Sequence, residues 1–217
     1  MRALVGYQLA TLVRSQRWVG PFVTYLGLLA FVYASQAGPA VPAYGVTGYA
    51  LLVMSAWLAS ATLGAENEVA RQVTAATAGS QVRVQVAALV AAAVAATLLA
   101  VAAVGWALVA NTAYSASVKS VVGGLALHAV FALLGLGIGA LLGRPLVNGS
   151  GQAALGILAV TMLALIVPGS PVQGCLRVLE SNPVHGFAGR LLPYVAVFVA
   201  LAGAALAYSV RTSRGRS

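Results

Sequence analysis

The sequence has few charged residues, and this shortage decides its class. Charged residues make up 7% of the chain and hydrophobic residues 61%, with a mean hydropathy of +0.95. Soluble domains carry about 25% charged residues, so the composition excludes an ordinary soluble protein. Only three residues are acidic, against twelve that are basic. The composition predicts an all-α integral membrane protein.

Cysteine and catalytic motifs are also scarce. The single cysteine, Cys175, excludes an intramolecular disulfide and any metal site built from several cysteines. An intramembrane serine protease needs a G-x-S-G motif and a histidine, but the nearest match, 148–151, lacks the first glycine and lies at a span edge. Its histidine would be His128 or His185. We therefore expect no catalytic, metal-binding or cofactor-binding residue in this chain.

Long uncharged stretches predict the membrane spans. A charged side chain at the centre of a span costs about 2.5 to 3.5 kcal/mol, so charges mark where the chain leaves the lipid. The longest uncharged stretch, 18–65, has room for two helices of roughly 20 residues, with a break at the two prolines of 37–43. The six predicted spans are 19–36, 44–63, 84–109, 121–142, 151–168 and 191–210.

The basic residues predict the orientation. With six spans both termini lie on one side, which carries nine of the twelve basic residues: Arg2, Arg14, Arg17, Arg71, Arg83, Arg144, Arg211, Arg214 and Arg216. Because basic residues concentrate in the cytoplasm, the termini and the 64–83 loop are predicted to be cytoplasmic. The net charge of +9 then suits an anionic inner leaflet, and no nucleic-acid partner is needed. The Arg- and Ala-rich, Lys-poor usage is typical of a GC-rich bacterial genome, so we expect the chain in a bacterial plasma membrane.

The segment before the first span, 2–18, is too charged to cross a bilayer. On a helix, apolar residues such as Leu9 and Leu12 share one face, and polar residues such as Gln8 share the other. This pattern predicts a helix lying in the inner interface, with Trp18 at the headgroup level. The alternative is a secretory signal cleaved near 35–37, which would leave an odd number of spans.

The 64–83 loop is polar between two apolar spans. It holds two of the three acidic residues, with Glu66 and Glu68 near the start of a predicted short helix, where carboxylates favour the helix dipole. Glu68 and Arg71 are three residues apart and can pair. The break at 78–80 predicts the end of this helix before Arg83. The alternative is an ordinary solvated loop.

Two features of the fourth span concern packing and polarity. Glycines recur every four residues at Gly135, Gly139 and Gly143, which predicts close approach of another helix, within the subunit or across a dimer. His128 lies in the middle of the same span. A histidine at this depth is either hydrogen-bonded and structural, or part of a proton relay or substrate pathway.

The outer segment 170–190 is neither clearly a span nor strongly polar. Pro183 and several glycines interrupt it, while its apolar residues require burial. A pair of short re-entrant helices in the outer leaflet reconciles these demands. Arg177 and Glu180 are three residues apart and can pair.

The predicted architecture resembles the permease subunit of a type-2 ABC exporter. An interfacial helix, six spans, a polar helix between spans two and three that begins E-N-E-x-x-R at 66–71, and a broken segment before the last span carry the resemblance. It covers nearly all of 1–217, read as one transmembrane permease domain. It implies that 64–83 couples to the ATPase and that 170–190, with Arg177 and Glu180, forms an outer gate. The coupling residues implied are Glu66, Glu68, Arg71, Gln72 and Arg83.

The resemblance also implies a mechanism and partners. A second permease chain, identical or homologous, completes the pathway, and two ATPase subunits bind ATP and Mg. The chain contains no GxxxxGK[ST] sequence, so ATP hydrolysis is expected in the partner. The small and apolar spans favour a hydrophobic or amphipathic cargo such as a lipid, antibiotic or peptide. The alternative is a membrane sensor or substrate-binding subunit that docks an ATPase without transporting.

Overall fold

The computed structural model describes residues 1–35, 40–110, 118–143, 147, 149–180, 193–197, 199–200, 203–204 and 207. Within these residues the secondary structure is helical, without strands. Eight helices have assigned bounds: α1 Arg2–Arg14, α2 Val19–Ser35, α3 Ala40–Leu63, α4 Glu68–Ala78, α5 Gln81–Ala110, α6 Val118–Leu142, α7 Ser150–Ile166 and α8 Pro171–Glu180. The predicted all-α class is confirmed for this part of the chain.

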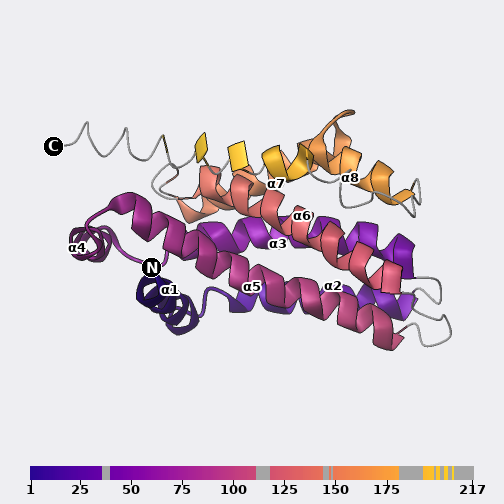
Figure 1. The fold of residues 1–217 in the computed structure, drawn as a ribbon, viewed down its shortest axis with the longest axis horizontal. Helices are drawn as coiled ribbons and strands as arrows, with labels where there is room; N and C mark the ends of the chain where they lie inside the picture. Colours follow the sequence, from indigo (N-terminus) through magenta and orange to yellow (C-terminus); the bar gives the residue numbers. More distant parts are fainter. Residues whose placement is uncertain are drawn as a thin grey trace.

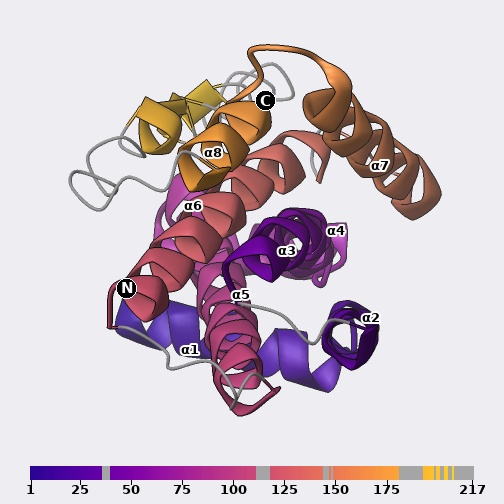
Figure 2. The same cartoon turned by 90° about the vertical axis from the view of Figure 1, so that its right-hand side faces the viewer.

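Helix α3 lies at the centre of the bundle. It contacts α1, α2, α5, α6, α7 and α8, and Figure 2, which views the bundle along its length, shows the others around it. Leu51, Leu52 and Leu58 of α3 are fully buried, as are Leu99 of α5 and Phe131 of α6. In Figure 1, α2, α3, α5 and α6 run along the long axis, while α1 and α4 lie across one end, where they are seen end-on.

Three helices are long and apolar enough to cross a membrane: α3 over Ala43–Leu63, α5 over Gln81–Ala110 and α6 over Ser120–Leu142. They match the predicted spans 44–63, 84–109 and 121–142. Large apolar side chains also face outward from the bundle, including Leu98, Leu155 and Ile166, which are 59%, 70% and 71% exposed. Outward apolar faces of this kind suit a lipid surrounding. The fold fits an all-α membrane protein.

The structure corrects the prediction of six spans. The predicted spans 19–36 and 151–168 correspond to α2 and α7, each of 17 residues, or about 26 Å at 1.5 Å per residue, which falls short of a hydrocarbon core of about 30 Å. A bend of 74° separates α1 from α2, and the two could count together as a fourth crossing. Half of the predicted span 191–210 lies outside the described residues, as does the second of the two predicted re-entrant helices.

Helix α1 occupies the predicted interfacial segment but buries a different face. Gln8 and Leu12 are each 2% exposed, whereas Val13 is 59% exposed, because α1 packs against α5 along the Gln8 side. The predicted apolar face therefore holds in part, because Leu12 from that face is buried but so is Gln8 from the predicted polar face. Gln16, with φ of 55°, turns the chain from α1 into α2, a conformation that is uncommon for a residue other than glycine.

The glycines at 135, 139 and 143 bring α6 against α3 within the subunit. A Cβ atom at Gly135 would overlap the carbonyl oxygen of Leu52 and the hydroxyl of Ser55, and one at Gly139 would overlap the carbonyl oxygen of Ala56. At Gly143 a Cβ would lie 3.2 Å from Leu63 Cδ1. The predicted close packing is confirmed. Of the two alternatives, packing within the subunit and packing across a dimer, these glycines show the first.

Candidate functional site: the α4 surface

Helix α4 is closed at both ends by capping residues. Asn67 is the N-cap, and its Oδ1 accepts a hydrogen bond of 2.7 Å from the backbone N–H of Ala70. Gly79 ends the helix with φ of 70°, a left-handed conformation that glycine adopts without strain. The sequence prediction of a short helix that begins near Glu68 and breaks at 78–80 is confirmed.

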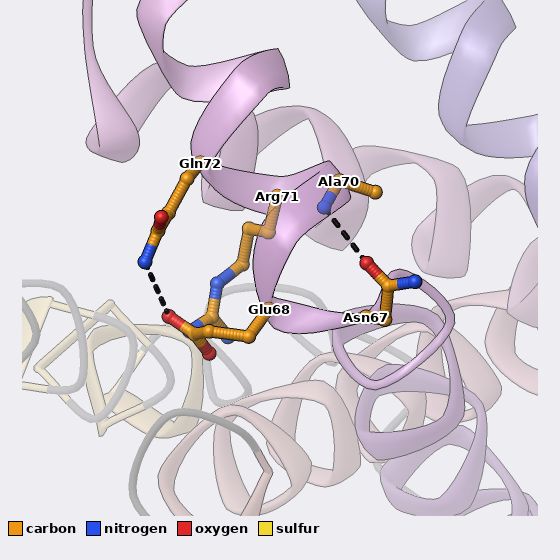
Figure 3. A network of polar contacts seen from close by, with 5 residues as sticks. All are labelled: Asn67, Glu68, Ala70, Arg71 and Gln72. Carbon is orange, nitrogen blue, oxygen red and sulfur yellow. Dashed lines mark hydrogen bonds and ion pairs between the residues drawn. The ribbon is translucent and has the colours of Figure 1, made fainter.

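The first turn of α4 carries a network of polar side chains (Figure 3). Arg71 Nη2 lies 2.5 Å from Glu68 Oε2, and Gln72 Nε2 donates to Glu68 Oε1 at 3.5 Å. The Glu68 side chain is 56% exposed and that of Arg71 is 17% exposed, so the carboxylate faces water. The predicted pairing of Glu68 with Arg71 is confirmed, and it orders one edge of the helix.

Glu66 lies in the interior, although the sequence placed it among the coupling residues. It is 7% exposed, and its Oε1 accepts hydrogen bonds from Gln8 Nε2 at 3.4 Å and from Thr74 Oγ1 at 3.3 Å. The carboxylate therefore joins α1 to α4. It can position α4 but does not belong to its outward surface.

A second tie holds the loop that leads into α4. The Nη1 of Arg17, in the turn between α1 and α2, donates a hydrogen bond of 2.6 Å to the carbonyl oxygen of Gly64 at the end of α3. The exposed Arg83 of α5 donates to the carbonyl oxygen of Ala78 at 3.5 Å. The loop is thus attached to the turn before it and to the helix after it.

The outward face of α4 is apolar. Val69 and Val73 are 71% and 60% exposed, and Ala76 continues the same row one turn later. We call Val69, Val73 and Ala76 the docking face. The sequence analysis missed these residues, although their spacing of four and three places them on one side of a helix. The face is bordered by Glu68 and Gln72, so an apolar strip lies beside polar side chains.

A groove lies between α1 and α4. It has a volume of about 740 Å³ and is lined by residues that include Tyr7 of α1, Val73 and Thr77 of α4, and Arg83 of α5. Val73 thus belongs both to the docking face and to the groove beside it. An apolar side chain of a partner could contact both.

His128 is held by hydrogen bonds inside the bundle. It is fully buried, with Nδ1 2.7 Å from the carbonyl oxygen of Gly124 and Nε2 3.0 Å from Thr47 Oγ1. Because a carbonyl oxygen can only accept, Nδ1 carries the proton of the neutral ring. The ring also packs edge-on against Tyr44, with centroids 5.6 Å apart. These contacts favour the structural alternative for His128.

The predicted outer gate is described in part. Arg177 lies on α8 with its side chain exposed, and α8 packs against α3 and α7. The side chain of Glu180, its predicted partner, lies outside the described residues. Among the residues that were searched, no group of three or more His, Cys, Asp or Glu side chains could hold a metal ion.

The fold and the α4 surface together define a class: an all-α membrane-type bundle with a capped amphipathic helix across one end. No family model, curated protein or solved structure matches the chain. The functional argument therefore rests on the residues of the α4 surface.

Proposed function

We propose that the chain is the membrane-spanning subunit of an ATP-driven exporter and that α4 docks a separate ATPase subunit. The observation that carries the proposal is the docking face. Two exposed valines stand on a helix that is capped at both ends and tied to its neighbours through Glu66 and Arg17. An exposed apolar row on a fixed helix suits insertion into the groove of a partner protein.

The connections of α4 support a mechanical role. Helix α4 follows α3 and precedes α5, and both of these helices are long and apolar enough to cross a membrane. Helix α3 also packs along α6 through the close contacts of Gly135 and Gly139. A displacement of α4 by the partner would reach the bundle through both flanking helices. In the proposed cycle, two ATPase subunits that sandwich ATP and Mg move the α4 helices of two permease chains and reopen the pathway.

The membrane orientation, the second chain and the cargo in this proposal follow from the sequence. The chain lies in the bacterial plasma membrane and crosses it through α3, α5 and α6, with the bent α1–α2 pair as a fourth crossing. Both termini are cytoplasmic, and a second permease chain completes the pathway. The cargo is hydrophobic or amphipathic. Glu68 and Gln72 border the docking face, and Arg83 lines its groove. Arg71 pairs with Glu68, and Glu66 positions the helix.

A membrane sensor that docks an ATPase without transporting is the second candidate function. The docking face supports it equally, because docking does not require a pathway. The two candidates differ in whether ATP drives flux of a cargo through a dimer of the chain.

Affinity purification of the tagged full chain from its native host in mild detergent tests the proposal. We expect a stoichiometric soluble subunit carrying a Walker A sequence, identified by mass spectrometry. Recovery of the chain without an ATPase, at a detergent concentration that keeps it folded, would contradict both candidates.

A further inference from the structure

A second cavity lies between α2, α3 and α7. It has a volume of about 730 Å³ and opens beside the turn that joins α1 to α2. Figure 2 shows α2 and α7 on the same side of α3. Its lining includes Gln16, Arg17, Gly20, Trp57, Gly149 and Ile157.

One end of the cavity is polar and positively charged. The Arg17 guanidinium is exposed and held by its 2.6 Å bond to the Gly64 carbonyl, and it pairs with no acidic residue among those described. Gly149, the N-cap of α7, lines the same end and has no side chain with which to cap that helix. Uncapped backbone N–H groups at a helix N-terminus add a partial positive charge. An anion would meet Arg17, Gln16 and this helix end together.

The other end of the cavity is apolar. Trp57 of α3 forms a wall, with its ring packed so closely on Gly20 that a Cβ there would lie 3.1 Å from it. Ile157 of α7 forms the facing wall and is 3% exposed. Trp57 lies seven residues before Gly64, and Ile157 lies seven residues after Ser150. Each separation is about 10 Å along the helix. The cavity therefore changes from charged to apolar over the depth of a lipid headgroup and the start of its acyl chain.

We propose that this cavity binds one anionic phospholipid of the inner leaflet. The phosphate lies against Arg17 and the N-terminus of α7, and an acyl chain follows the wall of Trp57 and Ile157. The amphipathic gradient selects a lipid over a free phosphate, because the apolar half of the cavity gains only from a hydrocarbon chain. The positive charge selects an anionic headgroup over a zwitterionic one. The proposal rests on the membrane location and on the proposed cytoplasmic side of α1, and it is independent of ATPase docking.

Native mass spectrometry of the purified full chain in detergent tests the lipid site. The probes are dioleoylphosphatidylglycerol, dioleoylphosphatidylcholine with the same acyl chains, and inorganic phosphate. We expect one phosphatidylglycerol to remain bound at collision energies that remove the other adducts. Phosphatidylcholine should bind about tenfold more weakly, and inorganic phosphate should leave no adduct.

Two variants and one matched control separate the parts of the site. Arg17→Gln should weaken phosphatidylglycerol binding about tenfold, and Ala154→Phe, which fills the apolar wall at an exposed position, should abolish the retained adduct while Arg17 remains. Arg14→Gln removes an equal charge from the end of α1, outside the cavity, and should leave the adduct unchanged. Equal retention of both lipids, retention of phosphate alone, or no effect of Arg17→Gln and Ala154→Phe would overturn the proposal.

Discussion

Single atoms decide how closely α3 and α6 approach. At Gly135 and Gly139 the α6 backbone lies against carbonyl oxygens of α3, which cannot move aside as the tip of a side chain could. Small residues at such crossings allow van der Waals contact between backbones, the main source of helix association in lipid. The residues of this crossing thus set the geometry of the two helices that pack most extensively against each other.

Gly135→Ala should therefore separate α6 from α3. Overpacking of a tight contact costs about 1 to 3 kcal/mol, so we expect a lower thermal unfolding midpoint in detergent. Gly27→Ala is the matched control, because a Cβ there meets nothing within 4 Å and alanine favours a helix. Equal midpoints for the two variants would show that the α3–α6 contact is looser than described.

The bond between His128 and Thr47 joins α6 to α3 at a second point. A double-mutant cycle with His128→Ala and Thr47→Val should give a coupling energy of about 0.6 kcal/mol, the average for such bonds in membrane proteins. Reversible unfolding in mixed detergent micelles measures it. A pathway role for His128 predicts a different pattern. His128→Ala would then abolish transport, while the unfolding free energy would be nearly unchanged and the coupling energy would be near zero.

At the scale of the element, α4 is a short helix that depends on its caps. Helices of this length are marginal alone, so their ends contribute much of their order. Asn67 satisfies one of the free backbone N–H groups, and Gly79 supplies the left-handed residue that ends the helix. A face that presents Val69 and Val73 in a fixed direction requires this order.

Asn67→Ala should fray the first turn of α4. Loss of an N-cap costs about 1 kcal/mol, which corresponds to roughly fivefold faster hydrogen exchange of the backbone amides of Ala70 and Arg71, which both bond to Asn67. Hydrogen–deuterium exchange with mass spectrometry measures the change. Gln72→Ala removes an exposed side chain with one 3.5 Å contact and serves as the control. Equal exchange in the two variants would contradict the role given to the cap.

The sequence predicted the long helices and α4 because their signals are local. Uncharged runs of sufficient length mark α3, α5 and α6, and the Glu-rich start and Gly79 mark α4. The burial of Glu66 and Gln8 could not be predicted, since it arises where α1 packs beside α4 and α5, a contact between distant parts of the chain. The bounds of α2 and α7 were also predicted to within two residues, and the error was to count stretches of this length as full spans.

At the scale of the whole molecule, the docking face and the lipid cavity lie near the same end of the bundle. The α1–α2 turn connects them, since Arg17 lines the cavity and also binds the carbonyl of Gly64 just before α4. A bound lipid and a docked ATPase would thus act on the same short segment. Both partners would then lie on the side of the membrane where α1 and α4 lie across the bundle (Figure 1).

Charge reversal beside the docking face should weaken the partner's attachment. Glu68→Lys and Arg71→Glu, made separately, each break the ion pair at the edge of α4 and replace one sign by the other. We expect less ATPase to co-purify with either variant while membrane insertion is unchanged, as judged by yield and detergent chromatography. If both variants bound the ATPase as well as the wild type does, Glu68 and Arg71 would not belong to the interface.

Substitution of the docking face itself tests the central claim most directly. Val73→Asp places a charge in the exposed apolar row, where it should leave folding within about 0.5 kcal/mol but reduce co-purified ATPase at least tenfold. Gln81→Glu adds the same charge at an exposed position at the start of α5 and should keep the ATPase at the wild-type ratio. An unchanged ratio for Val73→Asp would contradict the account, because α4 would then not be the surface that the ATPase binds.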